Sequence, residues 1–169
     1  ILCTIHRNNN TDEPKRLNAI VSALIKLSEE KEIIIPLHPR TKKLLDVNLD
    51  SSTYDTFINN SRIHITEPVS FLEMISLEKN ASLVLTDSGG VQKEAYFFKK
   101  PCIIMRSETE WKEIVEVGAA IIADADEEKI IEAYHHFKDN DTIEFPEIFG
   151  DGRAAEFICK ELINNKTRS

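Results

Sequence analysis

Four polar segments each follow directly on a short apolar run: His6-Arg7, His38-Pro39-Arg40, Asp87-Ser88-Gly89-Gly90 and Arg106. Together they supply imidazole, guanidinium, carboxylate and hydroxyl groups. Guanidinium groups bind phosphate through fixed pairs of donors, and a histidine near neutral pH can donate to a phosphate or shuttle a proton. These residue types point to an anionic ligand held by several segments at once.

The Asp87-Ser88-Gly89-Gly90 turn lies between a predicted strand over residues 82–86 and a predicted helix over 91–98. Two glycines let the backbone turn tightly and approach a ligand closely. The free N–H groups that open the helix then form an anion site, and Ser88 adds a hydroxyl donor. The same tetrapeptide also fits a plain turn in which Asp87 or Ser88 caps the helix. It is neither a dinucleotide fingerprint nor a P-loop, because no Gly-Lys-Ser/Thr follows.

Two further residues stand near this turn. Glu94 follows Gly90 by four residues, one helical turn later. Its carboxylate can accept hydrogen bonds from two sugar hydroxyls, as acidic residues near nucleotide turns do for ribose, or it is a solvated helix acid. His6 ends the first predicted strand beside Arg7, where it is either a ligand contact or a structural residue.

Three arginines, Arg7, Arg40 and Arg106, are candidate phosphate clamps. Each taken alone is compatible with an ordinary surface residue. Their common place at predicted strand ends indicates a local positive potential in a chain of formal net charge −8.

The hydrophobic pattern predicts the scaffold for these residues. Strands are predicted over residues 1–5, 32–37, 63–65, 82–86, 101–105 and 119–122. A loop over residues 8–12 precedes the first predicted helix, whose N-cap is Thr11 or Asp12 and whose inward residues are Leu17, Ile20, Val21, Leu24 and Leu27. Further helices are predicted over residues 42–47, 70–79, 91–98, 109–117 and 127–138. A polar stretch to residue 60 and a crossing loop over 139–149 separate some of these elements, and a last helix over 151–164 turns Ala155, Ile158 and Leu162 inward.

This alternation predicts right-handed crossovers and a parallel sheet covered on both faces. The fold class is therefore an open, doubly wound α/β domain of Rossmann-like type. Ligands of such sheets bind outside the carboxyl ends of the strands, where the four polar segments lie.

Composition excludes several classes of protein. The 169 residues correspond to about one domain, and 29 acidic against 21 basic residues argue against a nonspecific nucleic-acid binder. No apolar run reaches the roughly 18 residues of a membrane span. Cys3, Cys102 and Cys159 show no metal-ligand spacing, so neither a metal nor another cofactor is expected. The start at Ile1, within an apolar run, suggests a piece of a longer protein.

In order along the chain, the sequence resembles the carboxy-terminal half of the non-hydrolysing UDP-N-acetylglucosamine 2-epimerases. The matching segments are Thr4-Ile5-His6-Arg7, His38-Pro39-Arg40-Thr41, Glu67-Pro68 with Phe71-Leu72, Leu85-Thr86-Asp87-Ser88-Gly89-Gly90-Val91-Gln92-Lys93-Glu94-Ala95, Lys100-Pro101, Arg106 with Glu108-Thr109-Glu110, and Gly150-Asp151-Gly152-Arg153-Ala154. The long segment around the two glycines is specific, and the order of the shorter ones strengthens it.

The resemblance implies two Rossmann-like domains, as in GT-B glycosyltransferases, with a UDP-sugar in the cleft between them. Residues 1–169 would form the UDP-binding domain, and the last helix, about 151–164, would cross back to a missing amino-terminal domain. Ser88, Gly89 and Gly90 would meet the pyrophosphate, Glu94 the ribose, and His6, as the catalytic candidate, the phosphate and reacting sugar. Arg106 falls on a family-typical binding position. Further candidates are Arg7, Arg40, Asp87 and Trp111.

The implied activity is that of a cofactor-free isomerase that inverts C2 of a UDP-2-acetamido sugar by eliminating UDP and adding it back. The carboxylates that handle the C2 proton would belong to the absent half. The resemblance also implies a cytoplasmic homodimer in polysaccharide biosynthesis, with no nucleic-acid or membrane partner.

One departure affects the substrate. Trp111 stands where the plain epimerases usually carry arginine, and Val69-Ser70 replaces the Gln-Glu pair of some members. Glu108-Thr109-Glu110-Trp111 is similar to a branch acting on UDP-2,3-diacetamido-2,3-dideoxyglucuronate. Two other hypotheses remain beside these epimerases: the donor-binding domain of a GT-B glycosyltransferase and a non-catalytic sugar-nucleotide binding module.

Overall fold

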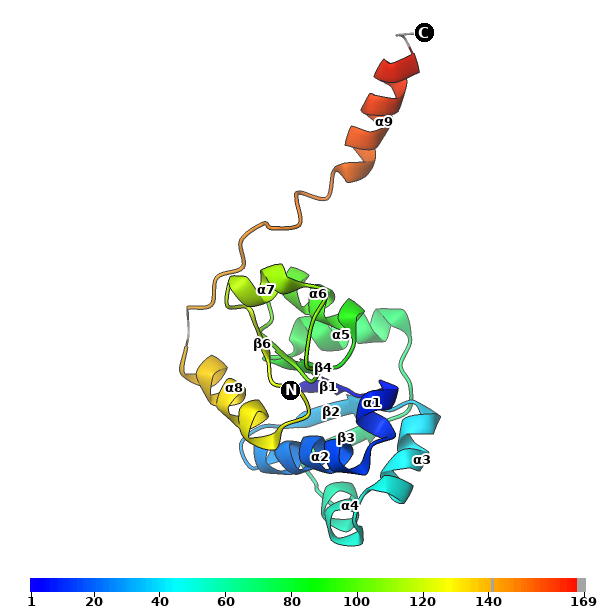
Figure 1. Ribbon diagram of the computed structural model, residues 1–169, viewed down its shortest axis with the longest axis vertical. Coiled ribbons are helices and arrows are strands. Elements are labelled where there is room, and N and C mark those ends of the chain that lie inside the picture. The colour runs from blue at the N-terminus through cyan, green and yellow to red at the C-terminus, as the bar shows by residue number, and fades with distance from the viewer. Residues whose placement is uncertain (141, 167–169) are drawn as a thin grey trace.

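In residues 1–140 and 142–166, the part of the chain that the computed structural model describes, six parallel strands form one sheet (Figure 1). The strands are β1 (Leu2–Thr4), β2 (Ile33–Pro36), β3 (Ile63–Thr66), β4 (Val84–Thr86), β5 (Cys102–Ile104) and β6 (Ala120–Ile122). Their order is β3-β2-β1-β4-β5-β6, so the winding direction reverses between β1 and β4. This confirms the predicted doubly wound α/β fold, and it puts the crevice of the switch point between these two strands.

The register of β1 and β4 brings their carboxyl ends level. Leu2 pairs with Val84 and Thr4 with Thr86. The hydroxyl groups of Thr4 and Thr86 form a hydrogen bond of 2.6 Å between the strands. The residues that follow the two strands, among them His6 and Asp87, therefore leave the sheet side by side.

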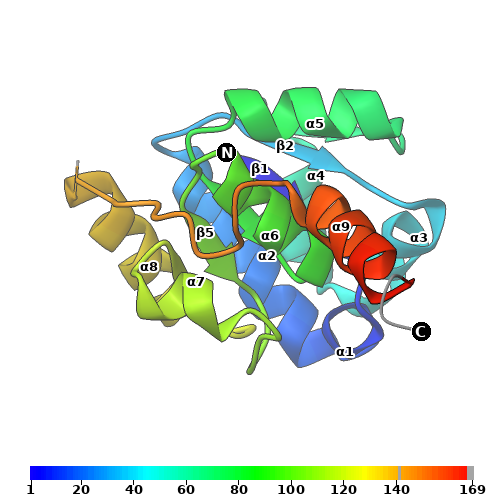
Figure 2. The same cartoon turned by 90° about the horizontal axis from the view of Figure 1, so that it is seen from above.

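Helices cover both faces of the sheet (Figure 2). One face carries α2 (Pro14–Ser28) and α8 (Glu127–Asp139), with α3 (Pro39–Asn48) and α4 (Ser51–Ile58) beside α2. The other face carries α5 (Phe71–Asn80), α6 (Gly89–Phe97) and α7 (Lys112–Glu116). Successive strand residues alternate between the two cores: Leu85 packs toward α2, and Val84 packs toward α6.

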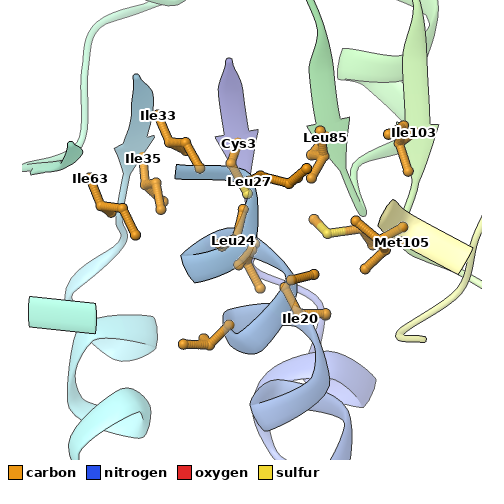
Figure 3. Packing of buried hydrophobic residues seen from close by; sticks show 14 of the residues in the cluster. Cys3, Ile20, Leu24, Leu27, Ile33, Ile35, Ile63, Leu85, Ile103 and Met105 are labelled. Atoms are coloured by element: carbon orange, nitrogen blue, oxygen red, sulfur yellow. The ribbon is translucent and has the colours of Figure 1, made fainter. Parts of the chain in front are cut away.

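The core under α2 follows the sequence pattern closely (Figure 3). Leu17, Ile20, Val21 and Leu24 are completely buried, as the spacing predicts. They contact residues of the central strands such as Cys3.

Two stretches predicted as irregular are helical. The predicted loop at 8–12 contains α1 (Asn8–Thr11), and α2 begins after Glu13, so the prediction that Thr11 or Asp12 caps α2 is wrong. The polar stretch before residue 60 contains α4, which starts at the Asp50 cap and buries only Phe57. Both helices are short and polar, and a hydrophobic period therefore does not mark them.

The inward face predicted for the last helix is also wrong. In α9 (Ala154–Lys166), Ala155 is exposed, as are Ile158 (55%) and Leu162 (64%). Figure 1 shows α9 lying away from the sheet at the end of the extended segment after α8. An amphipathic period identifies an apolar side of a helix but not what that side packs against.

The three cysteines differ sharply in exposure. Cys3 and Cys102 are buried in strands, and burial raises the pKa of both thiols. Cys159 is exposed on α9. Among the described residues, no three His, Cys, Asp or Glu side chains gather as metal ligands do. None of the described helices has the length and apolar character needed to cross a bilayer.

The packing predicts the effect of a core truncation. Leu24→Ala should lower the free energy of unfolding by about 2–5 kcal/mol, because a completely buried leucine leaves a cavity. Leu72→Ala is the matched control, since Leu72 is 76% exposed and should change stability by less than about 0.5 kcal/mol. Urea denaturation of both variants measures the difference, and equal losses would contradict this account of the core.

Candidate functional site

A cavity of about 560 Å³ opens at the carboxyl ends of the central strands. Its lining comes from the segment after β1, the first turn of α2 and the segment after β5. The lining residues are His6, Arg7, Asn8, Asn9, Asn10, Arg16, Arg106, Ser107 and Glu108. Three of these, His6, Arg7 and Arg106, are site residues that the sequence predicts.

A second pocket of about 220 Å³ adjoins the first and shares His6 with it. Apolar side chains from the α5 and α6 side, including Val69, Met74 and Val91, line much of it, together with Ser88. His6 therefore lies between a polar cavity and a more apolar pocket.

Asp87 is the centre of the hydrogen bonding between the two strand ends. Its side chain is completely buried and accepts hydrogen bonds from the backbone N–H groups of His6 (3.2 Å) and Arg7 (2.9 Å) and from Asn10 Nδ2 (3.1 Å). The His6 ring adds its Nδ1, which lies 3.1 Å from Asp87 Oδ1. Because Nδ1 is engaged, Nε2 is the ring nitrogen left to contact a ligand.

Asn10 and Arg16 support this arrangement, and sequence reasoning missed both. Asn10 Nδ2 also donates to the Met105 carbonyl (2.8 Å), and Asn10 Oδ1 accepts from Arg16. Arg16 in turn pairs with Asp124 and holds the pKa of that carboxyl below its usual value. The available signal for Asn10 was the run of three asparagines shortly after a strand.

The glycine turn opens α6 two residues earlier than predicted. Ser88 is the N-cap, and its hydroxyl accepts from Val91 N at 3.5 Å. Both glycines therefore belong to the first turn, where N–H groups lack intrahelical acceptors. A Cβ at Gly90 would meet only Ser88 Oγ, at 3.8 Å, whereas one at Gly89 would lie 3.2 Å from Glu110 Oε2. A side chain at Gly90 would therefore enter largely open space.

Arg106 and Glu110 form a two-pronged ion pair beside this turn. Both terminal nitrogens of Arg106 lie 2.8 Å from a Glu110 oxygen. Chiefly through Arg106, and with help from the positive charge of Arg7, the pKa of Glu110 falls to about 2. Arg106 and Glu110 thus lie against the first turn of α6, and Arg7 is near enough for its charge to act on Glu110.

Arg40 does not join them. It pairs with Asp12 and contacts Thr11, and it is not part of the cavity lining. The predicted convergence of three arginines is therefore wrong for Arg40, because an acidic residue next to α1 holds its guanidinium.

Trp111 contacts the backbone of the glycine turn. Its Nε1 donates to the Gly89 carbonyl at 2.7 Å, and Lys93 lies over its ring at 4.2 Å. Thr109 donates to Gln92 Oε1 (2.6 Å) and accepts from the Trp111 backbone N–H (3.0 Å). These contacts fix the segment after β5 onto α6.

Glu94 lies half-buried on α6, one turn beyond the glycines. Its carboxylate faces Glu78 of α5, a completely buried acid that sequence reasoning missed. Burial, and then the charge of Glu94, raises the pKa of Glu78.

The reversal of the sheet at β1 and β4, the open first turn of α6 and the two arginines beside it define the class of protein. It is a doubly wound α/β domain with a candidate anion site at its switch point. The chain belongs to the UDP-N-acetylglucosamine 2-epimerase family, whose family model matches residues 1–163. The resemblance stated from the sequence is confirmed.

Individual relatives agree with this assignment. The chain is 43% identical over 167 residues to the UDP-N-acetylglucosamine 2-epimerase of Methanocaldococcus jannaschii, covering 98% of this chain and 44% of the relative. It is 39% identical over 166 residues to the UDP-2,3-diacetamido-2,3-dideoxy-D-glucuronate 2-epimerase of Pseudomonas aeruginosa, covering 96% and 44%. The crystal structure of the M. jannaschii UDP-GlcNAc 2-epimerase in complex with UDP-GlcNAc and UDP superposes with a TM-score of 0.85 at 43% identity, over 96% of this chain and 44% of that one. The chain thus spans less than half the length of these relatives.

Asp87→Asn tests the hydrogen bonding at the strand ends. The amide group turns a donor toward groups that are themselves donors, and a buried polar group left unsatisfied costs about 1–3 kcal/mol. We expect that loss in the free energy of unfolding, measured by urea denaturation. Asp46→Asn, at an exposed position, is the control and should have no effect beyond about 0.5 kcal/mol. An Asp87→Asn protein as stable as the control would contradict the role given to Asp87.

Proposed function

We propose that this chain is the UDP-binding, carboxy-terminal half of a UDP-N-acetylglucosamine 2-epimerase with a GT-B-type pair of domains. The observation that carries the proposal is the open first turn of α6 with Arg7 and Arg106 beside it and with His6 aligned by Asp87. Membership of the epimerase family supports it. The proposal includes a cytoplasmic homodimer that works in polysaccharide biosynthesis.

The diphosphate would bind at the first turn of α6. Ser88 and the N–H groups of Gly89 and Gly90 would donate to its oxygens, since a helix N-terminus attracts anions. Arg106 and Arg7 would neutralise the rest of the charge, and the incoming phosphate would replace Glu110 as a partner of Arg106. Two anions compete there for one guanidinium, so binding requires the Glu110 side chain to move.

The nucleoside would lie on the α5 and α6 side of His6. The apolar pocket with Met74 and Val91 suits a flat base. Glu94 would accept hydrogen bonds from the ribose hydroxyls.

The reaction would proceed by elimination and re-addition. A base of the other half removes the C2 proton, the C1–O bond breaks, and its electron pair leaves with UDP, which gives a 2-acetamidoglucal. The UDP oxygen then attacks C1 again while a proton is added to the opposite face of C2. This chain would stabilise the departing negative charge through oriented N–H groups and cations. The imidazolium form of His6, in which both ring nitrogens are donors, would donate from Nδ1 to Asp87 and from Nε2 to the leaving phosphate.

A second candidate substrate is UDP-2,3-diacetamido-2,3-dideoxyglucuronate. Trp111 favours it, because the ring and its hydrogen bond to Gly89 occupy a position where the plain epimerases usually carry arginine. A protein that turns over this uronate and leaves UDP-N-acetylglucosamine unchanged would select the second candidate.

The activity test uses the full-length protein. It should convert UDP-N-acetylglucosamine to its manno epimer, observed by NMR of the C2 proton, with exchange of that proton in D₂O. His6→Ala should lower kcat by roughly 10²–10⁴-fold, the usual contribution of one acid–base group, with the fold intact by circular dichroism. No turnover of any UDP-2-acetamido sugar, or sugar transfer to an acceptor without inversion, would overturn the proposal.

Gly90→Ala tests the phosphate site separately from the fold. A methyl group there meets only Ser88 Oγ at 3.8 Å, so the helix should gain about 0.5–1 kcal/mol of stability. The same methyl group occupies the approach to the N–H groups, and we expect UDP affinity, measured by calorimetry, to fall by tenfold or more, about 1.4 kcal/mol. Ser76→Ala, on the exposed side of α5, is the control and should leave binding unchanged. Unaltered affinity in Gly90→Ala would place the diphosphate elsewhere.

A further inference from the structure

Glu78 is a buried acid with no hydrogen-bond partner for either carboxylate oxygen among the described residues. Its exposed fraction is 0%. Buried polar groups are normally hydrogen-bonded, and a buried charge without a partner is strongly unfavourable. Such an exception on the helix beside the glycine turn calls for a physical reason.

The group that faces Glu78 from α6 is another acid, Glu94. The lysines of the two helices point elsewhere: Lys79 lies over the Phe98 ring at 5.7 Å, and Lys93 lies over the Trp111 ring. No basic group of the described residues lowers the pKa of Glu78. Two adjacent carboxylates without a cation cannot both be charged at low cost.

A single proton resolves both problems. Two ionised carboxylates contain no donor, which is why the oxygens of Glu78 have no partner. A proton on Glu78 converts it into an O–H donor for Glu94, and the pair then carries one negative charge instead of two.

We propose that Glu78 is a positioning residue that keeps a proton and donates it in a hydrogen bond to Glu94, so that the Glu94 carboxylate is held in the orientation that accepts the ribose hydroxyls. This inference rests on the proposed function, in which Glu94 contacts the ribose. Neither the family assignment nor the sequence gives Glu78 a role.

The arrangement makes nucleotide-sugar binding depend on pH. Below pH 7 the pair shares its proton, and Glu94 is held. The pKa of Glu78 is raised to about 7 by burial and by the charge of Glu94. Above that pH the second charge separates the two carboxylates and also repels the diphosphate, so binding weakens.

The experiment compares full-length wild type, Glu78→Gln and Glu78→Met by calorimetry with UDP-N-acetylglucosamine at pH 6, 7 and 8. This ligand is chosen because its diphosphate is a diester and, unlike the terminal phosphate of UDP, does not titrate in that range. Any contribution of His6 is common to the three proteins and cancels in their ratios. Glu78→Gln keeps a donor toward Glu94 but cannot ionise, whereas Glu78→Met removes the donor.

We expect wild-type affinity to fall about tenfold from pH 6 to pH 8 relative to Glu78→Gln, as one group with a pKa near 7 loses its proton. Glu78→Met should bind more weakly than Glu78→Gln at every pH. It should also discriminate less between UDP and 2′-deoxy-UDP, because its Glu94 is no longer held.

A second measurement follows the fold itself. A carboxyl whose pKa is higher in the folded protein than in the unfolded chain favours folding while it is protonated. For Glu78 this contribution is fully present below pH 4.5, the usual pKa of the group, and it is lost as the pH rises through about 7. The Tm of wild type should therefore fall more between pH 5 and pH 8 than the Tm of Glu78→Gln.

The outcomes separate the two proposals. Nucleotide-sugar binding with the same pH dependence in wild type and Glu78→Gln, or unaltered discrimination in Glu78→Met, would overturn the positioning role alone. A wild-type protein that binds no uridine nucleotide at any of the three pH values would overturn the proposed function, and the ribose role of Glu94 with it.

Discussion

The buried carboxylate of Asp87 is the interaction on which the site depends. It lies at the end of β4, yet every donor described above comes from residues that follow β1. A completely buried carboxylate is tolerated only when donors surround it, so the chain after β1 has one favourable course across the switch point. That course puts His6 and Arg7 beside the glycine turn, and it fixes which ring nitrogen of His6 is available. The stability of the fold and the geometry of the candidate site thus depend on the same hydrogen bonds.

Positive side chains gather at the candidate site although the net charge of the chain is −8. Arg7 and Arg106 stand where the first turn of α6 already attracts anions, and Glu110 balances them in the absence of another anion. Because its pKa is about 2, Glu110 stays ionised throughout the physiological range. Glu78 of α5 and Glu94 of α6 show the reverse situation: two acids meet, and no cation of the described residues lowers the pKa of Glu78. The proposed binding mode uses both groups, the cations for the diphosphate and Glu94 for the ribose.

The sequence predicted the fold well because its strands are continuous apolar runs and its long helices have clear periods. It also predicted that His6, Arg106 and the glycine turn lie together, since the carboxyl ends of parallel strands share one edge. The remainder depends on partners that no local pattern records. Arg40 is held by Asp12, and Glu78 gains its significance only from an acid on the next helix. Short polar helices such as α4 fail for a related reason, because they contribute little to the core.

The uneven exposure of the three thiols gives the molecule a built-in site for chemical labelling. A maleimide or spin label should attach at Cys159, while Cys3 and Cys102 are protected for as long as the sheet is intact. Cys159 on α9 would then react at the rate of an accessible thiol, whereas labelling of Cys3 and Cys102 would require global unfolding. A single reagent therefore distinguishes the exposed thiol of α9 from the two thiols that react only on loss of the folded state.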